Sequence, residues 1–208
     1  MSFDQWCMDL CDVYAQRSKD ESTKLGCVIM APAPGRQQLS QGYNSFPRGI
    51  NDYVPERQVR PAKYSWFTHA EANAVYNAAR SGVSLQGGIL YCQWLPCPTC
   101  AMAVIQSGIE EIVVASFDVP ERWRGDMRIS VTMLGEAGVG IRLVDGDIQD
   151  YGYVLKVLNR VFNEDQEGYN ALVDDVRQNG ILATCSVCDE CDAPVGTPCD
   201  WTCTSWKR

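Results

Sequence analysis

The sequence predicts a three-layer α/β/α domain with a mixed five-stranded sheet, followed by a small Cys-rich C-terminal tail. One helix-like segment precedes two strand-like segments, helix-like and strand-like segments then alternate, and five of the eleven cysteines fall after residue 180. A helix and two strands followed by such alternation are typical of a mixed sheet with helices on both faces. The chain has 208 residues, 46% of them hydrophobic, which suits one globular domain with a small appendage.

The first part of the chain supplies a helix and a hairpin. Residues 2–17 carry apolar side chains at near-helical spacing, which predicts the first helix. Residues 25–30 are a β-type run, and the Pro- and Gly-rich turn at 31–36 leads into a second strand that ends near Tyr43. We interpret residues 44–67 as a long loop, and loops of this length within a compact domain are usually functional.

Helices and strands then alternate along the chain. The expected order is helix 70–80, strand 89–93, helix 98–107, strand 112–116, helix 126–137 and strand 139–144. We divide the chain into a catalytic domain over 1–145, a helical extension over 146–180 and a Cys-rich tail over 181–208, with the boundary near Asn179–Gly180.

Charge and hydropathy narrow the function classes. The net charge of −8 argues for a small substrate, because proteins that grip long nucleic acids are usually basic. No apolar run approaches the length of a membrane span. The N-terminal residues lack the basic region of a signal peptide, so we expect a cytoplasmic protein.

Two short segments carry the predicted chemistry. The first contains His69 and Glu71, and the second contains Pro96, Cys97 and Cys100. Together they match H-x-E and P-C-x-x-C, the signature of zinc-dependent nucleobase deaminases. Thiols three residues apart at the start of a helix face the same side and are favoured as thiolates there.

The three predicted ligands, His69, Cys97 and Cys100, leave one tetrahedral position open for water, as a catalytic zinc requires. Glu71 would move protons without binding the metal. A lone His is more often structural, and a lone C-x-x-C often is too. The full set in strand-helix context makes coincidence a poor explanation.

Longer stretches of the chain resemble the deoxycytidylate (dCMP) deaminase branch of the cytidine deaminase superfamily. The resemblance covers about residues 1–145 and is carried by residues 17–29, 42–49, 69–75 and 95–109. The discriminating stretch is GlyTyrAsnSerPheProArgGly at 42–49. The resemblance implies a cytidine-deaminase-like fold and hydrolysis of dCMP to dUMP, which supplies dTMP synthesis.

The resemblance also implies roles for single residues. Asn44 would hydrogen-bond the deoxyribose, Thr23 and Lys24 would lie near the phosphate, and Trp123 would cover the nucleotide from the loop after the fourth strand. Lys24 could equally be a solvated charge at a strand end. Members of the family are commonly hexamers regulated by dCTP and dTTP. Some hold a structural zinc with His in the insertion before H-A-E, but residues 51–68 here contain no Cys or His.

The tail predicts a second, structural zinc. Paired cysteines with Gly and Pro between them are typical of a site with four thiolates, and we favour Cys188, Cys191, Cys199 and Cys203. Cys185 could replace Cys188. The rival interpretation is a disulfide or free-thiol tail, and a reducing cytosol disfavours the disulfide form.

Three other functions compete with deamination of free dCMP. The substrate could be a 5-modified dCMP, such as a 5-methyl or 5-hydroxymethyl form. A polynucleotide cytosine deaminase could use the tail to bind nucleic acid, although the acidic balance and residues 42–49 oppose this. A catalytically dead fold is disfavoured because His69, Glu71, Cys97 and Cys100 are all present.

Overall fold

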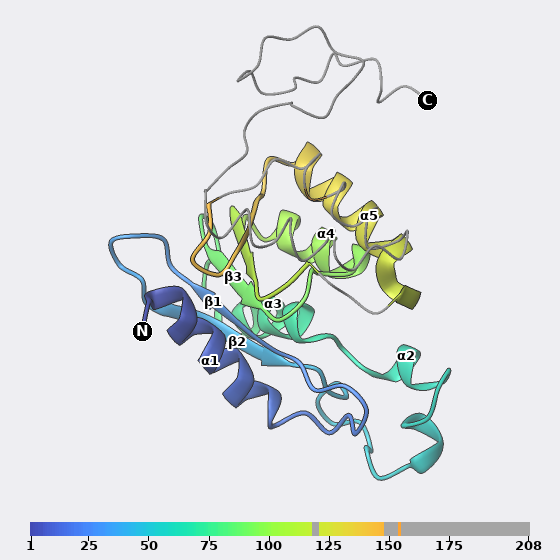
Figure 1. The fold of residues 1–208 in the computed structure, drawn as a ribbon. Helices are drawn as coiled ribbons and strands as arrows, with labels where there is room; N and C mark the ends of the chain where they lie inside the picture. Colours follow the sequence, from blue (N-terminus) through green and yellow to red (C-terminus); the bar gives the residue numbers. More distant parts are fainter. Residues whose placement is uncertain (118–120, 148–153, 155–208) are drawn as a thin grey trace, which may run out of the picture.

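The computed structural model describes residues 1–117, 121–147 and 154, and the fold over these residues is shown in Figure 1. The predicted helical extension and the Cys-rich tail lie almost entirely outside these residues. The elements in chain order are α1 (Phe3–Ala15), β1 (Gly26–Met30), β2 (Gln38–Tyr43), the 3-10 helix η1 (Pro55–Arg57), α2 (Lys63–Trp66), α3 (Ala70–Ser81), β3 (Ile89–Cys92), α4 (Pro98–Gln106), β4 (Glu111–Val114), α5 (Glu121–Glu136) and β5 (Gly140–Leu143).

The five strands form one mixed sheet in the order β2-β1-β3-β4-β5. Strand β1 is antiparallel to both β2 and β3, whereas β3, β4 and β5 run parallel. The hairpin and the parallel half therefore meet along β1 and β3, which confirms the predicted mixed five-stranded sheet.

The two faces of the sheet bury different helices. Helix α1 packs on β1 and β3, and Cys7, Met8 and Cys11 join a cluster with Val28, Met30, Tyr91 and Val113. The alternate strand residues, such as Ile29, Leu90 and Ile112, belong to a larger cluster on the opposite face, which includes residues of α3, α4 and α5. Because side chains alternate along a strand, the sheet is covered on both faces, and the three-layer prediction is confirmed (Figure 1).

One glycine sets how closely α3 approaches the sheet. A Cβ atom at Gly42 of β2 would overlap the backbone of Ala70 and Ala74 in the first turns of α3. The absence of a side chain therefore lets the start of this helix lie directly on β2. This contact places the residues just before and inside α3 against the edge of the sheet.

Two predicted elements need correction. The segment predicted as a loop over 44–67 contains η1 and the single-turn helix α2, whose first residue Lys63 is buried with its charge paired. Helix α5 begins at Glu121, five residues before the predicted start, because Gly125 lies within the helix. Trp123 is therefore a residue of the first turn of α5 and does not lie in a loop.

Within the described residues, no helix combines the length and the apolar character needed to span a membrane.

Candidate metal centre and active site

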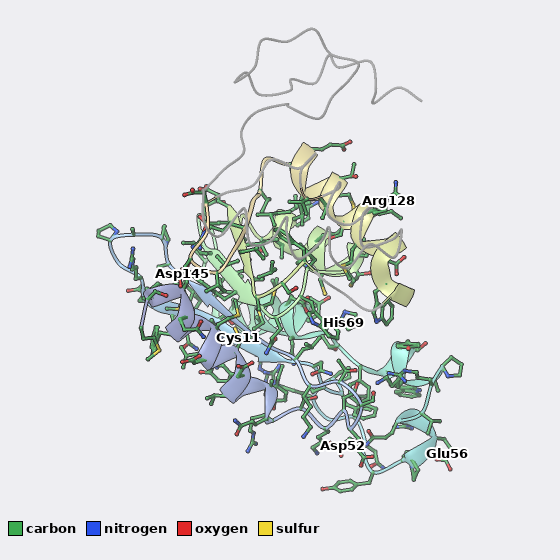
Figure 2. All side chains as sticks on the ribbon, viewed as in Figure 1. Cys11, Asp52, Glu56, His69, Arg128 and Asp145 are labelled. Atoms are coloured by element: carbon green, nitrogen blue, oxygen red, sulfur yellow. The ribbon has the colours of Figure 1, made fainter. Side chains whose placement is uncertain are left out.

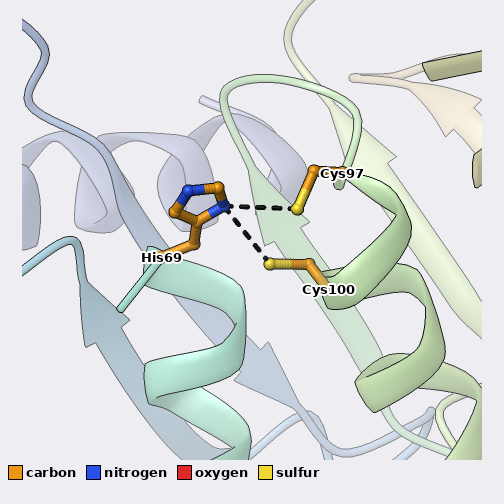
Figure 3. A group of neighbouring side chains, drawn as sticks. All are labelled: His69, Cys97 and Cys100. Atoms are coloured by element: carbon orange, nitrogen blue, oxygen red, sulfur yellow. Dashed lines mark hydrogen bonds between the residues drawn. The ribbon is translucent and has the colours of Figure 1, made fainter. Parts of the chain in front are cut away.

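Three predicted ligands meet where two helices begin. His69 is the N-cap of α3, Cys97 is the N-cap of α4, and Cys100 lies in the first turn of α4. Figure 3 shows the imidazole of His69 pointing at both sulfur atoms. The His69 Nδ1 atom lies 3.3 Å from Cys97 Sγ and 3.6 Å from Cys100 Sγ. The structure thus brings together residues that are 28 and 31 positions apart in the chain.

The three donors fit a zinc ion. With Zn–S and Zn–N bonds of about 2.3 and 2.0 Å, tetrahedral geometry separates a nitrogen and a sulfur ligand by about 3.5 Å. The two observed separations lie on either side of this value, and the three ligand atoms are all within 4.8 Å of one another. One imidazole and two thiols are a donor set that zinc prefers, and three protein ligands leave a fourth position for water or substrate.

The surroundings of these ligands favour a thiolate. The pKa of Cys97 is lowered to about 4, first by a hydrogen bond with the Cys100 thiol and then, against burial, by His69. The pKa of His69 is raised to about 9, chiefly by its hydrogen bond with Cys97. The N-terminus of α4 also carries partial positive charge beside both sulfurs. One thiolate is therefore present near neutral pH before any metal binds, which assists capture of a cation.

Glu71 lies two residues after the predicted ligand His69. It belongs to the first turn of α3, and its side chain is buried. Its Oε2 atom has no hydrogen-bond partner among the described residues. Burial raises the pKa of this carboxyl, and the nearby His69 partly opposes the shift. A buried carboxylate oxygen without a partner costs free energy unless a ligand satisfies it, so this oxygen marks a place where water or substrate would bind.

A cavity opens beside this group, and His69, Glu71 and Cys97 line it. It is lined by Asp20, Thr23, Leu25, Gly26, Asn44, Arg60, Lys63, Tyr64, Phe67, His69, Ala70, Glu71, Cys92, Gln93, Trp94, Leu95, Cys97, Trp123 and Met127. The lining comes from the sheet, the first parts of α3 and α5, and the segments that join α1 to β1, β2 to α3 and β3 to α4. Figure 2 shows His69 at the start of α3, with Asp52 and Glu56 on the part of that segment that projects from the sheet.

Three of the four residues expected around the substrate line this cavity. These are Thr23, Asn44 and Trp123. Lys24 is exposed and does not line it. The backbone at Leu25 enters β1, so the preceding lysine points to solvent, which agrees with the alternative interpretation of Lys24 as a charge at a strand end.

The amide of Asn44 already makes two internal hydrogen bonds. Its Oδ1 atom accepts from Leu25 N at 2.8 Å, and its Nδ2 atom donates to the Thr23 carbonyl at 2.8 Å. Its own backbone N–H donates to the Leu25 carbonyl at 3.1 Å. Asn44 therefore positions the turn that contains Thr23. One N–H of the amide remains beyond these bonds.

The sequence did not identify two cationic residues of the cavity wall. Arg60 and Lys63 come from the segment that was expected to be a loop. Neither residue belongs to a recognisable motif. The only sequence signal was a pair of basic residues three positions apart shortly before His69. Tyr64, the neighbour of Lys63, also lines the cavity and packs edge-on against Trp123, with ring centroids 5.4 Å apart.

The other described cysteines are buried. Cys7, Cys11 and Cys27 are completely buried, and burial raises the pKa of each. Cys92 is also buried with a raised pKa, and it lines the cavity. Cys7 and Cys11 lie on the α1 face of the sheet and do not line the cavity.

Comparison with known proteins gives the same picture for most of the described chain. The sequence-family model for the cytidine and deoxycytidylate deaminase zinc-binding region matches residues 1–116. A deaminase of Aliivibrio fischeri, uncharacterised and encoded in the luxG 3′ region, is 34% identical over 133 residues, covering 63% of this chain and 86% of that protein. The deoxycytidylate deaminase of Mus musculus is 31% identical over 121 residues, covering 56% of this chain and 66% of that enzyme.

A solved structure shares the fold. The dCMP deaminase of cyanophage S-TIM5, crystallised with dCMP and dUMP, superposes with a TM-score of 0.53 at 22% identity, covering 69% of this chain and 98% of that one. At this level of identity the match concerns the arrangement of helices and strands.

Proposed function

Because the chain belongs to the cytidine and deoxycytidylate deaminase family, we propose that it hydrolyses the exocyclic amine of dCMP, giving dUMP and ammonia. The observation that carries the proposal is that His69, Cys97 and Cys100 meet beside the cavity that Glu71 lines. One oxygen of Glu71 has no hydrogen-bond partner among the described residues. The dUMP formed would supply dTMP synthesis.

His69, Cys97 and Cys100 would hold the zinc ion. When bound there, zinc supplies a Lewis acid that lowers the pKa of a coordinated water from about 15.7 to around 7. The ligand side chains cannot take up the proton released, because coordination occupies their donor atoms. The Asp20 carboxylate also lines the cavity, but its oxygens already accept from Ser22, Thr23 and Lys63. This leaves Glu71 as the carboxylate of the described cavity that would accept the proton.

Glu71 would act as the proton carrier. Its buried position raises its pKa, which makes the carboxylate a better base than a solvated one. It would accept a proton from the attacking water and deliver it to the ring nitrogen N3. It would then carry the proton of the added hydroxyl to the amine, which would leave as ammonia. The aromatic side chains of Tyr64, Phe67, Trp94 and Trp123 give the cavity flat apolar walls that suit a pyrimidine ring.

The deoxyribose would lie beside Asn44. The second N–H of the Asn44 side-chain amide, which is not used in the bonds to Leu25 and Thr23, would donate to the sugar. Thr23 lines the same part of the cavity. These contacts would select a deoxynucleotide over a free base.

The direct test compares four substrates with the zinc-loaded full chain. These are dCMP, CMP, deoxycytidine and a single-stranded oligonucleotide containing cytosine, with ammonia release as the readout. We expect the highest kcat/KM for dCMP and at least a roughly 100-fold lower value for deoxycytidine, because several charge-assisted contacts to the phosphate would be lost. Preference for the oligonucleotide would identify a polynucleotide deaminase. Preference for 5-methyl-dCMP or 5-hydroxymethyl-dCMP in a parallel assay would identify a modified base as the substrate.

Several features of the proposal concern the rest of the chain or its partners. A second zinc at Cys188, Cys191, Cys199 and Cys203 lies outside the described residues and stays a prediction. Assembly into a hexamer, regulation by dCTP and dTTP, and a cytoplasmic location likewise stay predictions from the family resemblance and the composition.

A further inference from the structure

A buried ion pair forms part of the cavity wall outside the metal ligands. Lys63 Nζ lies 2.7 Å from Asp20 Oδ2, and the two residues are only 6% and 7% exposed. Both residues line the same cavity as Glu71. Burying two charges costs desolvation free energy that the pair does not always recover, so a buried pair at a cavity calls for a functional explanation.

The carboxylate of Asp20 is fully used inside the protein. Its Oδ1 atom accepts from Ser22 N at 2.9 Å, Ser22 Oγ at 2.8 Å and Thr23 N at 3.2 Å, while Oδ2 accepts from Lys63. Burial raises the pKa of Asp20, but the hydrogen bonds from Lys63 and Ser22 outweigh burial and lower it overall. Asp20 is therefore an ionised internal group that shapes the turn and holds the lysine.

The cationic groups of Lys63 and Arg60 keep hydrogen-bond donors that have no partner within this cluster. An ammonium group has three donors, and Lys63 spends two of them, on Asp20 and on Ser22 Oγ at 2.6 Å. Arg60 Nη2 also donates to Ser22 Oγ, at 3.3 Å, and leaves most of its guanidinium donors for other partners. Since the Ser22 hydroxyl donates its proton to Asp20, its oxygen is the acceptor for both cations.

This corner of the cavity carries an excess of positive charge. Two cations, Arg60 and Lys63, face one carboxylate, Asp20, and these two are the only Lys or Arg residues among the described residues that line the cavity. The local excess contrasts with the net charge of −8 of the whole chain. An anion is the ligand that would complete such a group.

We propose that Lys63 and Arg60 bind the phosphate of the nucleotide substrate, and that Asp20 and Ser22 are positioning residues that hold the two cations. The inference rests on the proposed function and specifies how that site would tell a nucleotide from a nucleoside. It assigns phosphate binding, which the family resemblance suggested for Lys24, to Arg60 and Lys63 in the segment before α3.

The test measures the ratio of kcat/KM for dCMP to kcat/KM for deoxycytidine. Arg60→Ala removes an exposed side chain, so the fold does not depend on it. The double variant Asp20→Asn/Lys63→Met removes both charges of the buried pair together and leaves no unpaired carboxylate. Arg80→Ala, at the exposed end of α3, is the matched control, and Lys24→Ala tests the competing assignment.

We expect Arg60→Ala and the double variant each to lower the ratio at least about tenfold, as loss of a charge-assisted contact requires. Arg80→Ala and Lys24→Ala should keep the native ratio. Calorimetry should show the same loss of discrimination between the product dUMP and deoxyuridine, a readout that does not depend on turnover.

Two outcomes would overturn the inference alone. The first is an unchanged ratio in Arg60→Ala together with unchanged dUMP affinity, which decides the matter even if the double variant does not fold. The second is a fall in the ratio for Lys24→Ala alone, which would place the phosphate elsewhere. If the native protein prefers dCMP and these variants keep that preference, only this inference fails. If the native protein shows no preference for dCMP over deoxycytidine, the proposed function fails with it.

Discussion

Two pairs of cysteines, one on each face of the sheet, have similar spacing but different surroundings. Cys7 and Cys11 lie four residues apart within α1, and Cys97 and Cys100 lie three apart at the start of α4. Burial raises the pKa of Cys7 to about 11, whereas the pKa of Cys97 is lowered to about 4 by its neighbours. The pKa of Cys100 is raised, like those of Cys7 and Cys11, so Cys97 alone among these four thiols has a lowered pKa.

The difference shows that the position of a cysteine and its neighbours decide whether it forms a thiolate, more than the spacing of the pair does. Cys97 precedes the first turn of α4, where free N–H groups and a partial positive charge stabilise a thiolate, and His69 supplies a third donor. Cys11 lies in the middle of α1, and its thiol donates to the Tyr91 carbonyl at 3.3 Å beneath the sheet. A thiol in that position packs as a small apolar group.

Replacing one cysteine of each pair gives the largest expected contrast. Cys97→Ala should remove the catalytic zinc and all measurable deamination, since two protein ligands hold zinc poorly. Cys11→Ala should keep both and lose roughly 1 kcal/mol or more of unfolding free energy from the small void. Elemental analysis counts zinc per chain, which should fall from two to one in Cys97→Ala if the tail binds its own ion. Retention of activity in Cys97→Ala would refute the assigned ligand set.

The Glu71→Gln variant separates metal binding from proton transfer on the same face of the sheet as Cys97. The amide keeps the shape of the side chain but cannot accept the proton, so we expect normal zinc content and at least a roughly 1,000-fold loss of kcat. Removing a buried carboxylate that has no partner among the described residues should leave the protein at least as stable as the native form. Ammonia release, zinc analysis and thermal unfolding measure the three effects. Substantial turnover by this variant would rule Glu71 out as the proton carrier.

The smallest expected effect tests the α1 face. Asp4 accepts hydrogen bonds from Tyr91 Oη at 2.8 Å, Arg142 Nη2 at 3.1 Å and Asp145 N at 3.1 Å. Burial raises the pKa of Asp4, but these bonds outweigh burial and lower it overall. Its contribution to stability is therefore present above the pKa of the unfolded chain, near 3.9, and is lost as the pH falls through the lower folded value.

We expect Asp4→Asn to lower the free energy of unfolding by about 2 kcal/mol at pH 7 and by much less near pH 2. Urea denaturation at the two pH values measures the difference. Deamination per folded molecule should be unchanged, because Asp4 does not line the cavity. An equal loss at both pH values would show that the charge of Asp4 is not what holds α1 to the sheet.

The sequence predicted the cluster of candidate metal ligands better than the cavity around it. Helix geometry explains the spacing within each of the two short motifs, and the known signature that pairs H-x-E with P-C-x-x-C predicted that His69, Cys97 and Cys100 meet. Lys63 has no such pattern, because its partner Asp20 is 43 positions away and only the folded chain joins them. Trp123 was expected in a loop because a glycine two residues later hid the true start of α5.

Asn44 links recognition of the ligand to the order of the sheet edge. Strand β2 ends at Tyr43, but the backbone and side chain of Asn44 continue the pairing with Leu25 and Thr23 for one more step. A nucleotide that binds the remaining amide donor of Asn44 would stabilise these hydrogen bonds with Leu25 and Thr23. The Leu25 amide proton should therefore exchange with deuterium more slowly in the liganded protein. Substrate binding and local opening of the ends of β1 and β2 are therefore coupled, because both involve Asn44. Kinetic data on any Asn44 variant would reflect changes in both.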